Sequence, residues 1–210
     1  MRNLVAICVV LAMFLGLTLA DGARAFPDVA PDRLDYVAVT GLATKGAVEG
    51  FTDGTFRPEA VVLRGQFVKM LAAAVFLPSG EPEMTPFQDL GGSGTGSSLE
   101  RYVAGAYLAG IVKGKSIRMF EPYALLTRAQ AMTIAVRTAQ KLDARDLKPL
   151  PNGYRGWFAR FDDPVHGESA KLAEANHLLA GIDLAGWEPF EPTTRSEAAL
   201  IVWNLVNCFG

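Results

Sequence analysis

Residues 50–58 read Gly-Phe-Thr-Asp-Gly-Thr-Phe-Arg-Pro, and the Phe-x-Pro tripeptide at the end of this stretch recurs as Phe-Glu-Pro at residues 120–122 and 190–192. Each copy follows a glycine and precedes an arginine. The three sets are Gly46, Phe56-Arg57-Pro58 and Arg64; Gly110, Phe120-Glu121-Pro122 and Arg128; and Gly181, Phe190-Glu191-Pro192 and Arg195. Internal repetition of this kind predicts an architecture built from copies of one supersecondary unit.

Three repeats fill most of the chain. An aromatic-acidic opener precedes each one: Phe26-Pro27-Asp28-Val29, Phe87-Gln88-Asp89-Leu90 and Phe161-Asp162-Asp163-Pro164. We therefore expect repeats at residues 26–77, 87–141 and 158–207. The first two repeats keep the same spacing from glycine to arginine, whereas this distance falls from 18 residues in the first repeat to 14 in the third.

Each repeat is predicted to hold two helices joined by a loop. The first helices are expected at Tyr36–Ala43, Leu99–Leu108 and Leu172–Leu179, each ended by the glycine of its repeat. The second helices share one apolar stripe, formed by Phe67, Met70, Leu71, Ala74 and Val75; by Ala131, Ile134, Ala135, Thr138 and Ala139; and by Ala198, Ile201, Val202, Leu205 and Val206. One such hairpin cannot bury its stripe alone, so we expect an all-α fold in which three helix-loop-helix repeats form a pseudo-threefold bundle.

The first 25 residues have the order of a secretory signal peptide. Arg2 precedes an apolar run over residues 4–20, and Ala23-Arg24-Ala25 supplies a small-x-small cleavage site. An uncleaved membrane anchor is the alternative, because this run is at the short limit for crossing a bilayer. Cleavage would leave a secreted chain with no membrane span and with Cys208 as its single cysteine, so that no internal disulfide could form.

Charge and motif content exclude several classes of function. The formal net charge is −2 and no basic patch stands out, so we expect neither a nucleic-acid partner nor an anionic membrane. The two histidines, His166 and His177, have no metal-ligand spacing, and no catalytic motif accompanies them. We therefore expect no catalytic residue, no metal and no cofactor.

The starts of the second helices carry capping residues. Thr127 and Thr194 stand three residues before Gln130 and Glu197, which is the spacing of a capping box. Leu63 occupies the corresponding position in the first repeat, and its side chain cannot cap.

An arginine follows the capping position in every repeat, at Arg64, Arg128 and Arg195. A cation at a helix N-terminus opposes the helix dipole, so helix formation alone does not favour it. One interpretation is that the guanidinium groups and free helix amides hold an anionic ligand. The other is an internal ion pair with the acidic openers, which are Asp28, Asp89 and Asp163.

The aromatic residues of the repeated loop have two expected roles. Phe51 stands beside the Asp53-Gly54 turn, where its ring could stack on a sugar. Phe56, Phe120 and Phe190 are expected to fill space between helices.

Together these motifs resemble the S-layer homology domain family, whose repeat opens with Phe-x-Asp-Val, carries Gly-Ile-Ile-x-Gly and Asp-Gly-Thr-Phe-x-Pro, and closes with Ile-Thr-Arg-Ala-Glu. The matching stretches are residues 26–29 and 53–58 in repeat one, 110–114 and 127–130 in repeat two, and 181–182, 190–192 and 194–197 in repeat three. The resemblance implies a secreted protein that attaches non-covalently to the bacterial cell wall, at the S-layer, through an anionic and often pyruvylated secondary cell-wall polysaccharide.

The resemblance also assigns the ligand-binding positions. They are Arg64, Arg128 and Arg195, with Gln66, Gln130 and Glu197 at the fourth position of the closing motif. Gly50 and Phe51 of the first loop are further candidate ligand-binding residues, on the ground that the Phe51 ring could stack on a sugar. Of the arginines, Arg128 lies in the copy that matches the motif best. Leu63 and Gly65 depart from the motif, and the shortened third loop suggests that one groove is degenerate.

Two other functions stay open on the sequence. A structural envelope protein could use the same fold for self-assembly or for docking other envelope proteins, with the arginines as internal ion pairs. An envelope hydrolase would need a carboxylate pair at a cleft, for which the acidic openers such as Asp163 are the candidates.

Overall fold

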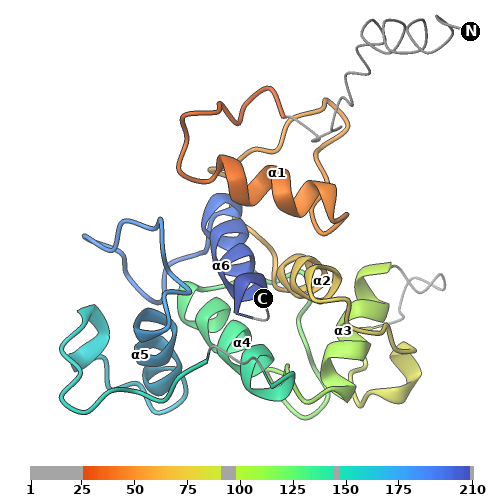
Figure 1. The fold of residues 1–210 in the computed structure, drawn as a ribbon. Helices are drawn as coiled ribbons and strands as arrows, with labels where there is room; N and C mark the ends of the chain where they lie inside the picture. The colour runs from red at the N-terminus through yellow and green to blue at the C-terminus, as the bar shows by residue number, and fades with distance from the viewer. Residues whose placement is uncertain (1–25, 91–97, 144–146, 209–210) are drawn as a thin grey trace, which may run out of the picture.

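The computed structural model describes residues 26–90, 98–143 and 147–208, and these segments are helical with connecting loops (Figure 1). The α-helices are α1 (Tyr36–Thr44), α2 (Arg64–Ala74), α3 (Ser98–Leu108), α4 (Arg128–Lys141), α5 (Gly167–Ala175) and α6 (Arg195–Asn207). Two short 3₁₀ helices, Pro82–Met84 and Trp157–Arg160, lie in the connections. The all-α fold class is confirmed.

The second helix of each repeat lies at the centre of the fold. Helices α2, α4 and α6 contact one another, while α1, α3 and α5 lie around them (Figure 1). Each outer helix packs mainly on the inner helix of the preceding repeat: α3 on α2, α5 on α4, and α1 on α6. The packed hairpin is therefore formed between repeats rather than within one, and the contact of α1 with α6 joins the first repeat to the last.

A closed ring of backbone hydrogen bonds ties the three repeats together ahead of the central helices. The amide of Val62 donates to the carbonyl of Thr193 at 2.9 Å, that of Thr193 to Leu126 at 2.8 Å, and that of Leu126 to Val62 at 3.1 Å. Each repeat thus uses one donor and one acceptor to satisfy its neighbours' buried backbone groups. These cyclic contacts accord with related repeats, and the symmetry of the whole bundle stays a prediction.

The acidic openers hold the repeated loops in place. Both carboxylate oxygens of Asp28 accept amide hydrogen bonds, from Phe56 at 2.8 Å and from Arg57 at 2.6 Å. Asp89 accepts in the same way from Phe120 at 2.9 Å and from Glu121 at 2.6 Å. The two phenylalanines are fully buried, as expected of residues that fill space between helices.

The third repeat departs from this pattern. Phe190 is 58% exposed, so its predicted role as a buried plug is wrong. Asp163 accepts instead from the amides of Val165 and His166, at 2.9 and 2.7 Å, in the turn directly before α5. The predicted helix Leu172–Leu179 is consequently misplaced, because α5 begins at Gly167 and ends at Ala175.

Most local predictions about the loops hold. Gly46 and Gly110 have φ values of 68° and 71°, which is the left-handed conformation expected of the glycines that end α1 and α3. Gly181, with φ 86°, does not end α5 as predicted, because that helix ends at Ala175 and His177 takes the left-handed conformation after it. The predicted signal peptide, residues 1–25, lies outside the described residues. In the part of the chain that is described, no helix has the length and apolar character needed to cross a membrane.

Candidate functional site

The amides at the start of each central helix are already used by the protein. In α2, Arg64 N donates to Ala124 O at 2.9 Å and Gly65 N to Pro122 O at 2.8 Å. The corresponding amides of α4 and α6 also donate to loop carbonyls of the following repeat in the cycle. The expected clamp of free helix amides is therefore absent at these positions. The guanidinium groups remain as candidate hydrogen-bond donors to an anion.

Arg64 is 6% exposed and holds the loop of repeat two. Its Nε donates to Phe120 O at 3.1 Å, its Nη2 donates to Lys113 O at 2.7 Å, and its guanidinium carbon lies 4.5 Å from the centre of the Phe120 ring. Burial lowers the pKa of Arg64 to about 10, so the group still carries its charge at neutral pH. Among the described residues, Nη1 has no hydrogen-bond partner.

Arg195 repeats this arrangement on the loop of repeat one. Its Nε donates to Phe56 O at 2.7 Å and its Nη2 to Glu49 O at 2.9 Å, and its guanidinium carbon lies 4.5 Å from the centre of the Phe56 ring. Burial lowers the pKa of Arg195 as well. In both arginines Nε and Nη2 thus donate to backbone carbonyls, and Nη1 can donate to a ligand.

Arg128 is engaged differently. It forms an ion pair with Glu197, in which Nη2 lies 2.8 Å from Oε1 and Nε lies 3.1 and 3.2 Å from the two oxygens. Trp187 lies beneath the guanidinium at 5.0 Å and donates from Nε1 to Glu197 at 2.6 Å. The shorter third loop therefore gives Arg128 a carboxylate partner where the other two arginines find a backbone carbonyl.

The alternative interpretation placed the arginines in ion pairs with Asp28, Asp89 and Asp163. The structure shows these three carboxylates on backbone amides instead. One internal ion pair does form, but with Glu197, a residue that the sequence placed in the capping box.

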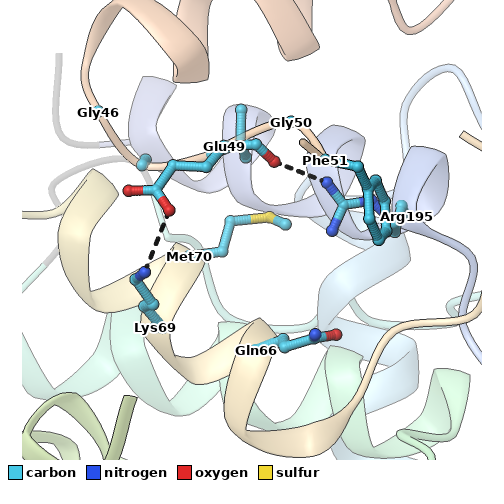
Figure 2. Close-up of a pocket in the computed structure, with 10 residues that line it drawn as sticks. Gly46, Glu49, Gly50, Phe51, Gln66, Lys69, Met70 and Arg195 are labelled. Carbon is cyan, nitrogen blue, oxygen red and sulfur yellow. Dashed lines mark hydrogen bonds and ion pairs between the residues drawn. The ribbon is translucent and has the colours of Figure 1, made fainter. Parts of the chain in front are cut away.

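Each arginine lines one of three grooves, which we name A, B and C. Groove A lies between Arg195 and α2, and Figure 2 shows Lys69 and Glu49 forming an ion pair at 3.5 Å along its wall. Its lining consists of Gly46, Ala47, Val48, Glu49, Gly50, Phe51, Gln66, Lys69, Met70 and Arg195. Groove A therefore offers two cations and one carboxylate to a ligand.

Phe51 and Gly50 contact other residues of the protein in groove A. The Phe51 ring lies 4.0 Å from the guanidinium of Arg57 and 5.0 Å from that of Arg195, so it orients both cations. A Cβ atom on Gly50 would lie 2.6 Å from the Phe26 ring and 2.9 Å from the carbonyl of Thr55, so glycine is required there by close approach.

Groove B carries the largest concentration of positive charge. It lies between Arg64, α4 and the start of α5. Its lining consists of Arg64, Lys113, Gly114, Lys115, Gln130, Thr133, Ile134, Arg137, Val165 and His166. Four of these side chains are lysine or arginine, one is histidine, and none is a carboxylate. Arg137 is half-buried, and this burial lowers its pKa.

Groove C is acidic. Arg128 is paired with Glu197 there, and Arg33 is paired with Asp35 and Glu59 at 2.9 and 3.0 Å. The remaining charged residues of its lining are Asp32 and Asp183. Because both cations already have carboxylate partners, an anion entering groove C would meet uncompensated negative charge.

The eight ligand-binding residues predicted from the sequence are thus divided among the grooves. Arg195, Gln66, Gly50 and Phe51 line or border groove A, Arg64 and Gln130 line groove B, and Arg128 and Glu197 line groove C. Oε1 of Gln130 is buried without a hydrogen-bond partner, and its side chain does not complete the capping box that Thr127 begins with the amide of Gln130 at 3.3 Å.

Sequence reasoning missed four residues of groove B: Lys113, Lys115, Arg137 and His166. The first two could have been found, because they stand at the positions of Glu49 and Phe51 in the repeat pattern and replace them with cations. His166 gave no signal, since it enters groove B from the third repeat. No cluster of three or more His, Cys, Asp or Glu residues that could hold a metal ion occurs in the described segments.

Comparison with known proteins relates this sequence to a family. The model of the S-layer homology domain matches residues 25–68 and 86–132. The chain is 27% identical over 205 residues to S-layer protein EA1 of Bacillus anthracis, covering 96% of this chain and 22% of that protein. It is 30% identical over 161 residues to an uncharacterized cell wall amidase of Bacillus anthracis, covering 75% of this chain and 28% of the amidase.

An endoglucanase of a Bacillus strain is also similar, with 26% identity over 210 residues that cover 97% of this chain and 22% of the enzyme. The chain therefore spans roughly a quarter of the length of these curated relatives.

Proposed function

Because the chain carries S-layer homology domains at residues 25–68 and 86–132, we propose that it is a non-catalytic module of the bacterial cell surface that binds an anionic cell-wall polysaccharide. Relatives described as S-layer proteins, a cell wall amidase and a glucanase share this segment while differing in name, which supports a common attachment role rather than a common reaction. A pyruvylated secondary polysaccharide is the ligand that the family resemblance favours.

The charge of groove B is the observation that carries this proposal. The chain as a whole is slightly acidic, with a formal net charge of −2, yet groove B is lined by four lysine and arginine side chains and no carboxylate. Clustered cations with no carboxylate among the lining residues repel one another, so their mutual electrostatics do not explain the cluster. An anionic ligand would turn this repulsion into attraction, and the half-buried position of Arg137 would strengthen it.

Retention on purified wall sacculi tests the proposal. The sacculi are prepared from an S-layer-bearing Bacillus, and one half is stripped of its secondary polysaccharide. We expect the parent protein to bind the intact sacculi and to lose binding on the stripped ones. Equal retention on both would contradict polysaccharide binding.

A pair of double variants locates the site. Lys115→Gln with Arg137→Gln removes two cations of groove B that have no ion-pair partner in the described chain. We expect retention to fall on the order of tenfold or more, because each lost charge-assisted contact weakens binding substantially. Lys148→Gln with Arg160→Gln removes the same charge from exposed positions outside the three grooves. Equal losses in both double variants would show a nonspecific charge effect and exclude groove B.

A further inference from the structure

His166 occupies a defined position in groove B. It lies directly before α5, and its Nδ1 is 2.7 Å from Oγ1 of Thr133 on α4. Thr133 is 2% exposed, and the same Oγ1 donates its proton to Ala129 O at 2.9 Å. The imidazole therefore contacts a hydroxyl whose one proton already has an acceptor.

This arrangement bears on the tautomer of the neutral imidazole. The hydroxyl of Thr133 has one proton and lies within hydrogen-bond distance of two acceptors, Ala129 O and His166 Nδ1. When Thr133 donates to Ala129 O it accepts from the histidine, so that Nδ1 carries the proton and Nε2 of the neutral ring carries a lone pair. Among the described residues Nε2 has no hydrogen-bond partner, so it is the atom that remains for a ligand.

From this geometry we propose that groove B takes up a proton together with its anionic ligand: His166 becomes an Nε2–H donor to a ligand oxyanion, and affinity rises as pH falls. The inference rests on the proposed function, since it concerns the same groove and an anionic glycan. In the neutral state the Nε2 lone pair faces the anion as a second acceptor, which disfavours binding. Protonation from solvent converts the repulsive atom into a charge-assisted donor.

The charged groups around His166 set the direction of the effect. Burial lowers its pKa below the ordinary value of 6.5, Asp163 opposes this, and Arg137, Lys115 and Arg64 lower the pKa further. An anion bound among these cations would offset their field and raise the pKa of His166 in the complex. Because the bound state then holds the proton more tightly than the free state, binding must strengthen as pH falls between the two pKa values. One proton changes affinity by at most about tenfold per pH unit.

Calorimetric titration between about pH 5 and pH 8 tests the inference. The probe is the pyruvyl ketal of a methyl N-acetylhexosaminide, because its carboxyl stays ionised over this range, whereas a phosphate would itself titrate near pH 6. We expect a severalfold lower Kd at pH 5.5 than at pH 7.5. Repeating the titration in buffers with different heats of ionisation should show uptake of up to one proton per ligand bound.

Three variants assign the proton to its site. His166→Gln is expected to bind with a Kd that no longer depends on pH and with no proton uptake. His177→Asn removes the other histidine, which lies outside the three grooves, and is expected to behave as the parent does. Thr133→Val removes the acceptor from Nδ1 and so favours the neutral Nε2–H tautomer; we expect it to bind more tightly than the parent at pH 7.5, which flattens the pH profile.

The outcomes separate this inference from the proposed function. A parent protein that binds the probe equally at all pH values, or a His166→Gln variant that keeps the pH dependence, overturns the role of His166 and leaves groove B as the anion site. No binding of the probe or of intact sacculi at any pH contradicts the proposed function itself. A loss of pH dependence in His177→Asn alone would move the proton to that residue and refute the inference.

Discussion

Nη2 of Arg128 lies 2.8 Å from Oε1 of Glu197, and this ion pair places a carboxylate beside the guanidinium in groove C. The same carboxylate accepts from Trp187 Nε1 at 2.6 Å and from the amide of Thr194 at 2.9 Å. A residue that caps α6 therefore also neutralises the arginine that matched the family motif best. The three related arginines thus have different hydrogen-bond partners, because the loops that contact them differ.

Replacing Glu197 with glutamine should destabilise the fold without affecting sacculus binding. The amide oxygen can still accept from Thr194, but Arg128 loses its ion-pair partner in a site where both side chains are mostly buried. We expect the free energy of unfolding to fall by about 1–3 kcal/mol in urea denaturation. Glu59→Gln, an exposed partner of Arg33 in the same groove, is the matched control and should change stability little. Weaker sacculus binding by Glu197→Gln would show that groove C does hold the anion.

Asp28→Asn should loosen the first repeat. Asp28 accepts from two amides, and an asparagine side chain can replace only one of these acceptors, so one of the two amides loses its partner. We expect a loss of about 1–3 kcal/mol in the free energy of unfolding, and a similar loss for Asp89→Asn in the second repeat. Asp32→Asn makes the same chemical change at an exposed position. Comparable stability of Asp28→Asn and Asp32→Asn would mean that the openers do not hold the loops.

Leu63→Thr should stabilise α2. Leu63 has φ −82° and ψ 151°, close to the −79° and 155° of the capping residue Thr127, and Gln66 already accepts from its amide at 3.1 Å. A threonine hydroxyl would therefore complete the capping box, and we expect a gain of up to about 1 kcal/mol in thermal or urea denaturation. Leu63→Val has the shape of threonine without the hydroxyl, so the difference between the two variants measures the cap. No difference between them would refute the expected hydrogen bond.

The stability of the unliganded protein should fall between about pH 7 and pH 5 because of His166. Burial, partly opposed by Asp163, lowers the pKa of His166 in the folded state below the 6.5 of the unfolded chain. As pH falls through about 6.5, the unfolded chain binds the proton first, so the free energy of unfolding decreases. Urea denaturation at several pH values should show a smaller decrease in His166→Gln than in His177→Asn. The opposite order would place the titrating group at His177.

The repeat pattern predicted the fold class because its information is local. The apolar stripe of Phe67, Met70 and Leu71 has helical spacing, and Gly46 supplies the left-handed residue that ends a helix; both properties act over a few residues. The same reasoning misplaced α5, since Asp163 orders the turn before that helix through hydrogen bonds to the amides of Val165 and His166, which the apolar pattern does not contain. Phe190 was likewise expected inside, but the shortened third loop leaves it exposed.

The sequence by itself determined that three arginines stand at the starts of three related helices. Only the tertiary structure decided which groups surround each of them, because each arginine finds its partner in another repeat: Arg64 in Lys113, Arg128 in Glu197, and Arg195 in Glu49. The physical reason is that the helix amides and most guanidinium nitrogens must be satisfied once buried, and the atoms that satisfy them lie far away in the chain. The positive charge of groove B also depends on the tertiary structure, because the fold brings together Lys115, Arg137 and His166 from three separate segments.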